Sequence, residues 1–298
     1  MIRCESLTKF FNGTRALEEC SFEISGPSIT GVIGVNGAGK TTLFKSLAGF
    51  LKPSGGNAYV FDQPAFQNII AAQNVILVDE SMEFYPGATL KELIDSYSRF
   101  YRNFDVKLAM GLLKYFNLQQ NAKYKTLSKG VRATFRLILG LSARAPITLL
   151  DEPADGMDPG VRTDLYQLIL KDYVKAPRII LISSHYLGEM EPILEDILFI
   201  HEGKVLKHDG LEVFESLLIA LQGPPDIIEL VEKRLKVYEG KNFGEGLRRI
   251  VVDKEAYELL DLSEKLRSRL TLQGISPEGS FTHLTRREGG GINELYDS

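Results

Sequence analysis

Short apolar runs alternate with stretches of helical periodicity along most of the chain. Residues 16–25 alternate between apolar and polar side chains, which predicts a half-buried strand, and the apolar run over 28–34 predicts a buried one. A helix is expected over 40–50, and another over 159–174. Further strands are expected over residues 57–62, 74–79, 146–150, 178–183 and 196–200. Strands that alternate with helices predict an α/β fold with a mostly parallel core sheet covered on both faces.

The middle and the end of the chain follow different patterns. From about residue 85 to 143 the periodicity is helical, which predicts a helical insertion into the sheet domain. One more helix is expected over 211–222, before the break at Gly223-Pro224-Pro225. Beyond the break we expect a short helix, strands near 235–239, 248–252 and 270–275, and a helix over 254–268. The predicted domains are therefore residues 1–222, with a helical subdomain at about 85–143, and a small α/β extension over 223–298.

Composition narrows the classes of function. The 298 residues are 44% hydrophobic and 25% charged, as in ordinary globular proteins, and the net charge is −4. A chain built to bind phosphate backbones normally has a basic face, so no nucleic-acid partner is expected. The two cysteines form no disulfide framework, which favours a reducing compartment. No apolar run approaches the ~20 residues needed to cross a bilayer, so we expect a cytoplasmic chain that reaches a membrane only through a partner.

A glycine-rich segment carries the first chemical signal. Residues 34–41, Gly-Val-Asn-Gly-Ala-Gly-Lys-Thr, match the pattern G-x-x-x-x-G-K-S/T in full. The glycines let successive backbone N–H groups point at one phosphate, and the helix that starts behind them adds its positive end. Lys40 is expected to reach the β- and γ-phosphates, and the Thr41 hydroxyl to ligate Mg²⁺. The required strand before and helix after this loop are both predicted.

Two carboxylates follow another predicted strand. The buried run over 147–150 ends in Asp151 and Glu152. Ligands gather at the carboxyl ends of strands in an open parallel sheet, so these side chains should face the phosphate loop. Asp151 is expected to hold Mg²⁺ and Glu152 to polarise an attacking water.

Taken together, residues 1–220 resemble the ATP-binding cassette (ABC) ATPases. Five features occur in that family's order: the phosphate loop, a degenerate signature Leu-Ser-Lys-Gly-Val over 127–131, Leu-Leu-Asp-Glu-Pro over 149–153, the loop 154–158, and Ile-Ser-Ser-His over 182–185. The resemblance implies a P-loop nucleotide-binding cassette whose N-terminal strands are antiparallel. It also implies that ATP and Mg²⁺ are held by the phosphate-loop residues Asn36, Gly37, Ala38, Gly39, Lys40, Thr41 and Thr42. It further implies that Phe11 stacks on adenine, that Glu152 is the general base and that His185 touches the γ-phosphate.

The same resemblance implies a dimer. Ser128 and Gly130 would complete the site of an opposite subunit, and Asp158 would lie at the contact between subunits. ATP would join two copies head-to-tail, as a homodimer or with a sister subunit, and hydrolysis would release them.

Four positions depart from the family pattern: Glu80, Lys129, Val131, which replaces a glutamine of the signature, and Ala154, which replaces a hydroxyl residue. Glu80 stands where a glutamine usually touches Mg²⁺, with Asp79 as the alternative if the alignment is shifted by one; the expected metal ligands are therefore Thr41, Asp151 and Glu80. Lys129 replaces a glycine of the signature and is expected to point to solvent, the alternative being a charge near the phosphate. These departures bear on the rate of hydrolysis, whereas the residues for ATP binding are intact.

The resemblance favours the energy subunit of a transporter, of the exporter type. Residues 80–94 resemble the stretch that receives a membrane partner's coupling helix, so the expected partner is a separate multi-span permease and the expected place is peripheral, on the inner face of the cell membrane. A soluble ABC ATPase acting on ribosomes or DNA is the alternative, although such proteins usually carry two cassettes or long coiled coils. A kinase or GTPase is disfavoured because the guanine-reading N-K-x-D is missing.

Overall fold

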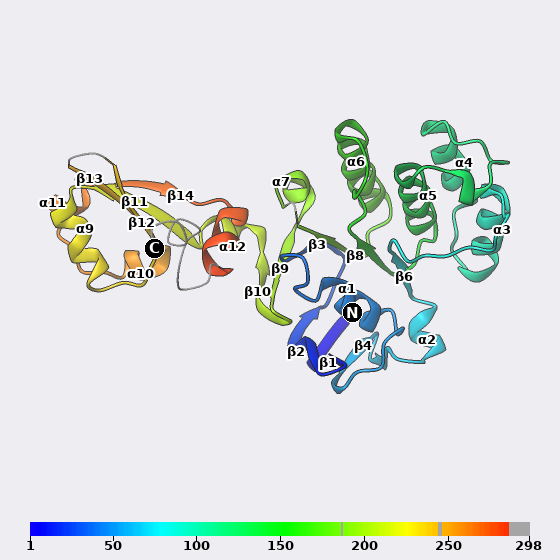
Figure 1. The fold of residues 1–298 in the computed structure, drawn as a ribbon, viewed down its shortest axis with the longest axis horizontal. Helices are drawn as coiled ribbons and strands as arrows, with labels where there is room; N and C mark the ends of the chain where they lie inside the picture. Colours follow the sequence, from blue (N-terminus) through cyan, green and yellow to red (C-terminus); the bar gives the residue numbers. More distant parts are fainter. Residues whose placement is uncertain (186, 244–245, 286–298) are drawn as a thin grey trace. The chain divides into compact units, whose positions relative to one another are not determined.

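The computed structural model describes residues 1–185, 187–243 and 246–285 (Figure 1). The chain divides into two compact units, residues 1–208 and 209–298. Each unit contains an apolar core of its own.

A six-stranded sheet forms the centre of the first unit, with the strand order β10-β9-β3-β8-β7-β6. Strands β3, β6, β7, β8 and β9 run parallel to their neighbours among themselves, which confirms the predicted parallel core sheet. Their bounds are β3 Ser28–Ile33, β6 Val75–Val78, β7 Ile147–Asp151, β8 Ile179–Ser184, β9 Asp196–His201 and β10 Lys204–Gly210. Every residue of β3, β6 and β8 is buried, as expected for strands covered on both faces.

A second sheet, in the order β2-β1-β4-β5, is antiparallel and comes from the N-terminal part of the chain. Its strands are β1 Ile2–Phe11, β2 Thr14–Ile24, β4 Gly55–Val60 and β5 Gln63–Pro64. Helix α1 (Lys40–Leu47) joins the two sheets, since Leu43 and Phe44 are fully buried in one core with Leu17 of β2 and Leu149 of β7. This confirms the predicted N-terminal antiparallel strands.

The predicted helical insertion is also present. It contains α3 (Leu90–Phe100), α4 (Val106–Tyr115), the 3₁₀ turn η1 (Tyr124–Thr126) and α5 (Lys129–Ser142), and it follows the short α2 (Ile69–Ala72). These elements share an apolar core with Ile94, Leu113 and Phe135 fully or almost fully buried. Helix α5 packs closely on the parallel sheet, because a Cβ on Gly140 would lie 2.4 Å from Val78 Cγ2. The C-terminal part of α5 is therefore held beside the carboxyl end of β6.

Helix α6 (Pro159–Lys175) carries a buried charge cluster on the first unit. Asp172 lies 2.7 Å from the Arg178 guanidinium and 2.6 Å from that of Arg144, and the Asp172 side chain is only 3% exposed. Arg178 precedes β8 and Arg144 follows α5, so one carboxylate ties three elements together. The chain then continues through α7 (Leu187–Met190) and η2 (Glu191–Ile193) into β9.

The second unit is a β-α-β-β-α-β arrangement with an antiparallel sheet in the order β12-β13-β11-β14. Its strands are β11 Leu218–Gly223, β12 Val237–Phe243, β13 Leu247–Asp253 and β14 Thr271–Gly274. Its helices are α8 Leu211–Glu215, α9 Pro225–Glu232, α10 Lys254–Glu258, α11 Glu264–Arg267 and α12 Pro277–Thr285. Ile219 and Leu221 pack in a core with α9, whereas Leu218 and Ala220 lie in a separate cluster.

Two helix predictions for this region are wrong. The helix expected over 211–222 ends after α8, because 218–223 are drawn into the sheet by pairing with β13 and β14. The predicted boundary after residue 222 consequently falls at the end of a strand of the second unit, while the compact units divide after His208. The helix expected over 254–268 is two short helices, α10 and α11.

Candidate nucleotide-binding site

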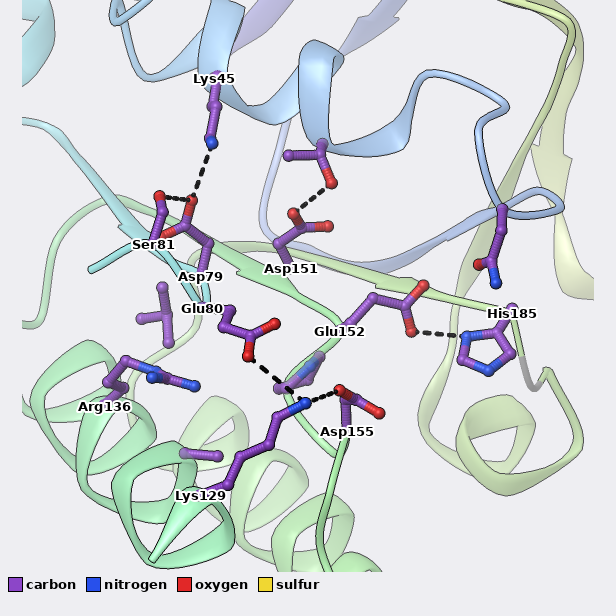
Figure 2. Close-up of a pocket in the computed structure, with 15 residues that line it drawn as sticks. Lys45, Asp79, Glu80, Ser81, Lys129, Arg136, Asp151, Glu152, Asp155 and His185 are labelled. Carbon is purple, nitrogen blue, oxygen red and sulfur yellow. Dashed lines mark hydrogen bonds and ion pairs between the residues drawn. The ribbon is translucent and has the colours of Figure 1, made fainter. Parts of the chain in front are cut away.

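A cavity of about 390 Å³ opens where the carboxyl ends of β6, β7 and β8 meet the start of α1 and the start of α5 (Figure 2). The phosphate loop contributes Asn36 and Thr41, the strand ends contribute Asp151, Glu152 and His185, and α5 contributes Lys129 and Arg136. Side chains far apart in the sequence meet here because all these strands run in the same direction.

The loop between β3 and α1 depends on its glycines. Gly39 has φ of 109°, and a Cβ there would lie 2.5 Å from the Ala16 carbonyl oxygen. This close approach fixes the start of α1, so that Lys40 turns back toward the loop. Lys40 Nζ donates to the Gly34 carbonyl at 2.7 Å and lies 3.3 Å from Glu152 Oε1. The loop, its lysine and the strand-end carboxylate are thus in direct contact.

Ser183 connects the two carboxylates at the end of β7. Thr41 Oγ1 donates to Asp151 Oδ2 at 2.6 Å, and Ser183 Oγ donates to Asp151 Oδ1 at 2.5 Å. The same hydroxyl accepts from the Glu152 backbone N–H at 2.9 Å. Ser183 lies there because the parallel register pairs it with Asp151. This serine was not among the predicted site residues; its position at the end of an apolar strand was the available signal.

Glu152 and His185 form a pair on the side of the cavity opposite Asp79 in Figure 2. His185 Nδ1 and Glu152 Oε2 are 3.0 Å apart, and because a carboxylate only accepts, Nδ1 carries the proton. Glu152 has φ of 47°, in the left-handed region that costs a residue with a side chain about 1–3 kcal/mol. Backbone strain of this kind concentrates at functional sites, and here it turns the carboxylate toward Lys40 and His185.

The oxygen donors fit a magnesium ion. Thr41 and Asp151 converge on one edge of the cavity, with their nearest oxygens 2.6 Å apart. Among the described residues, no group of three or more His, Cys, Asp or Glu side chains could cage a metal. Mg²⁺ normally keeps several waters and takes one or two protein oxygens together with substrate phosphates, so the Thr41–Asp151 pair suits it.

Lys129, at the start of α5, pairs with two acidic side chains. Lys129 Nζ lies 2.8 Å from Asp155 Oδ2 and 3.4 Å from Glu80 Oε1. The hydrogen bond with Lys129 holds the pKa of Asp155 below its ordinary value, and the same bond raises the pKa of Lys129. The Lys129 side chain is 56% exposed, as expected for a residue that reaches solvent, and it also lines the cavity.

Asp79 and Glu80, the two alternatives for the third metal ligand, lie in different surroundings. Asp79 is buried, accepts from Ser81 Oγ at 2.7 Å and lies 3.5 Å from Lys45 Nζ. Glu80 is 72% exposed and is directed to Lys129 (Figure 2). Both line the cavity, and Glu80 meets the signature segment there.

Comparison with known proteins decides the family. The family model of the ABC transporter matches residues 17–155. The ABC transporter ATP-binding protein YtrB of Bacillus subtilis is 30% identical over 222 residues, which cover 74% of this chain and 76% of YtrB. The chain belongs to the family of ABC transporter ATP-binding proteins.

A further relative and a solved structure are also similar to the chain. The bacitracin transport ATP-binding protein BcrA of Bacillus licheniformis is 24% identical over 258 residues, covering 84% of each chain. The dimeric structure of the bacterial ABC transporter cassette MJ0796 shares the fold, with a TM-score of 0.63 at 21% identity over 71% of this chain and 99% of that one. As an ABC ATP-binding protein, the chain has a nucleotide-binding domain of an ATPase family that serves transporters.

Four residues to which the ABC resemblance gave a role in ATP binding or at the contact between subunits do not line this cavity. Phe11 ends β1 with 43% of its surface exposed, and Lys9 Nζ lies 5.0 Å from its ring centre. Ser128 caps α5 by accepting from the Val131 N–H at 3.4 Å, and Gly130 follows in the first turn. Asp158 precedes α6 and is exposed. Within the part of this ABC protein that the structure describes, no helix combines the length and apolarity needed to cross a membrane.

Proposed function

We propose that this ABC protein hydrolyses ATP, with the residues around the cavity in distinct roles. The observation that carries the proposal is the meeting of the Thr41–Asp151 pair and the Glu152–His185 pair in one cavity beside Lys40. Glu152 would accept the proton of the attacking water, His185 would contact the γ-phosphate, and Lys40 would neutralise phosphate charge. The other loop residues, Asn36, Gly37, Ala38, Gly39 and Thr42, would hold the phosphates, and Phe11 would stack on adenine.

Mg²⁺ would be held by Thr41 and Asp151 and would neutralise charge on the phosphate oxygens. Ser183 supports this arrangement, because its hydroxyl fixes the Asp151 carboxylate and the Glu152 backbone at once. Glu80 was predicted as a third metal ligand. Its carboxylate lies 3.4 Å from Lys129 Nζ, so the lysine would compete with the metal ion for it.

We further propose that two copies join head-to-tail on ATP. Ser128 and Gly130 lie at the start of α5, where backbone N–H groups and the positive helix end favour an anion. Placed against a second subunit's nucleotide, they would supply the contacts that its own phosphate loop lacks, with Asp158 at the contact between the copies. The dimeric MJ0796 cassette supports this arrangement by its shared fold.

The dimer would power a separate multi-span permease, of the exporter type, from the cytoplasmic side of the membrane. Two similarities support this: the relatives named as transport ATP-binding proteins, and the likeness of residues 80–94 to a coupling-helix receiver. No observation favours the ribosome or DNA alternative.

The test compares Glu152→Gln with Lys40→Ala and the wild type. Glu152→Gln should bind Mg-ATP, lose at least about 100-fold in ATPase rate and elute as a dimer only with ATP, because the base is removed while the phosphate contacts remain. Lys40→Ala should lose ATP binding itself. Light scattering after gel filtration and a phosphate-release assay measure both effects. Wild-type hydrolysis by Glu152→Gln would exclude Glu152 as the base.

A further inference from the structure

A cavity of about 480 Å³ lies at the amino ends of three neighbouring strands of the parallel sheet, and we call it the amino-end pocket. Its lining includes the segments that lead into these strands: residues 25–27 before β3, Arg144 and Pro146 before β7, and residues 176–178 before β8. The nucleotide cavity, by contrast, is lined by residues at the carboxyl ends of β7 and β8. The two cavities therefore lie at opposite ends of the same strands.

The walls of the amino-end pocket are apolar and rigid. Pro27, Pro146 and Pro177 stand in three different loops, and each has a fixed φ and no N–H group to offer a ligand. Ile179 and Phe61 add apolar surface, and 42% of Phe61 is exposed. A preformed apolar cavity of this size suits a small molecule with an apolar body.

Arg144 adds a positive charge to this apolar lining. It follows the last turn of α5 with φ of 50°, in the left-handed region where glycine is the usual residue at a helix end. A residue with a side chain is strained in this conformation, and such strain concentrates at functional sites. The chain thus keeps a guanidinium at a position where glycine would relieve the strain.

Two arginines compete for one buried carboxylate beside the pocket. Asp172 lies 2.6 Å from Arg144 Nη1 and 2.7 Å from Arg178 Nη2. A second carboxylate, Asp105, is 38% exposed and lies 3.7 Å from Arg144 Nη2, too far for a hydrogen bond. The buried part of this cluster therefore has one negative charge for two positive charges.

The hydrogen bonds of the two arginines differ. Arg178 uses all three guanidinium nitrogens, which donate to Thr148 Oγ1, the Ala176 carbonyl and Asp172. Arg144 donates no hydrogen bond to any residue that the structure describes, because the direction of its N–H groups does not suit the nearby Asp172 oxygen. Buried N–H donors are satisfied in the great majority of cases, so the donors of Arg144 call for an acceptor from outside the chain.

The charges favour an acceptor with a single negative charge. The planar fork of an arginine matches a carboxylate with two hydrogen bonds. A phosphate dianion would bring a second negative charge close to Asp172 and Asp105. An amine would meet the like charges of Arg144 and Arg178.

We infer that the amino-end pocket binds a small apolar molecule that carries one carboxylate, and that Arg144 pairs with this carboxylate. The apolar body of the ligand lies against the three prolines and Phe61. Because the nucleotide cavity is at the other end of the strands, a ligand in the amino-end pocket leaves the nucleotide site accessible.

The first experiment compares three probes with one ring system on the full chain: naphthoate, naphthylmethanol and naphthylmethylamine. Calorimetric titration should show that naphthoate binds at least about 10-fold more tightly than the alcohol or the amine, because only the carboxylate forms a charge-assisted pair with Arg144. Equal affinities for the three probes, or no binding of naphthoate, would overturn the inference.

Arg144→Gly then tests the arginine without straining the helix end, since glycine accepts φ of 50°. Its affinity for naphthoate should fall at least about 10-fold, while its affinity for the alcohol stays the same. Arg269→Gly is the control, because it removes the same charge at an exposed position that does not line the pocket. Thermal melting verifies the fold. An unchanged affinity in folded Arg144→Gly overturns the inference, and the probe series on the wild type decides it if this variant unfolds.

Photolabelling locates the site. The probe is benzoylbenzoate, a benzophenone that carries a carboxylate, and mass spectrometry identifies the labelled peptides. We expect label in peptides that contain residues 144–146 or 176–179, and we expect naphthoate, but not Mg-ATP, to suppress it. Label that Mg-ATP suppresses, or label confined to other peptides, would contradict the assignment to the amino-end pocket.

Discussion

At the scale of single residues, one hydroxyl organises the nucleotide site. Ser183 donates to Asp151 and accepts from the Glu152 N–H, so it orients the proposed metal ligand and the proposed base together. Its geometry is a consequence of strand register, since Ser183 lies opposite Asp151 in the parallel pair β7–β8. The proposed roles of Asp151 and Glu152 therefore depend on Ser183, a residue to which we assign no role in the reaction itself.

Ser183→Ala should reduce the ATPase rate while nucleotide binding persists. Loss of a hydrogen bond to a charged group costs about 1.5–3 kcal/mol, which corresponds to a fall on the order of 10- to 100-fold. Steady-state hydrolysis and fluorescent-nucleotide titration measure the two effects. Ser46→Ala is the control, because the Ser46 hydroxyl donates to the Thr42 carbonyl within α1. An unchanged rate would show that strand pairing alone fixes Asp151.

A second residue-scale prediction concerns the Lys129–Asp155 pair. Lys129→Ala should raise the pKa of Asp155 toward its ordinary value, since the hydrogen bond from Lys129 is the main cause of the lowering. A lowered folded-state pKa stabilises the protein above the unfolded-state pKa, and this contribution is lost as the pH falls through the folded-state pKa. Carboxylate NMR titration measures the shift, with Lys114→Ala as the control. Identical Asp155 titrations in both variants would contradict the pairing.

At the scale of elements, packing on the parallel sheet decides which charges meet. Asp172 of α6 is shared by Arg144 after α5 and Arg178 before β8, and burial lowers the pKa of Arg178, although its partner Asp172 opposes this. A buried pair of this kind need not add stability over an apolar core. Removing only one partner of the pair lowers the free energy of unfolding, because the other charge then stays buried without a counter-charge.

Asp172→Asn should therefore lower the free energy of unfolding by about 3–5 kcal/mol, because two arginines lose their counter-charge. Urea denaturation at neutral pH measures the change. Asp164→Asn on the same helix, where the side chain is exposed, should change the free energy by less than about 0.5 kcal/mol. Equal effects of the two substitutions would mean that α6 is held by its apolar face alone.

At the scale of the whole molecule, the chain has two units with separate apolar cores. Ile227, Ile228 and Val231 of α9 are fully buried against residues of β11 and β13, all within residues 209–298. The parallel sheet and α1 form another core in residues 1–208. Each of these two cores is therefore built from residues of its own unit.

Ile228→Ala should destabilise the second unit by about 2–5 kcal/mol, because it removes a fully buried side chain and leaves a cavity. Hydrogen exchange should accelerate in β11 and β13 while β7 and β8 keep their protection. Leu230→Ala, at a position 41% exposed on the same helix, is the control. Faster exchange in β7 would show that the two cores unfold together.

The sequence by itself determined the main candidate site residues and the α/β fold that carries them. The phosphate loop over 34–41 is a local motif that is recognised by the spacing of its glycines and lysine. Asp151 and Glu152 follow an apolar run that is recognised as a buried strand from neighbouring residues alone. The parallel order of strands and helices followed from the same pattern. Local rules were insufficient for 211–222, since the run Leu217-Leu218-Ile219-Ala220-Leu221 suits a buried strand as well as a helix.

Only the tertiary structure decided which side chains meet. Ser183 reaches Asp151 through strand register, Lys129 turns to Glu80 and Asp155 through the position of α5, and Arg144 reaches Asp172 through the position of α6. Each contact joins residues that are remote in the chain. Its energy depends on how deeply the side chains are buried, which a local sequence pattern does not specify. Pairing in β11 likewise overrode a helical pattern, because neighbouring strands supplied hydrogen bonds for the buried backbone.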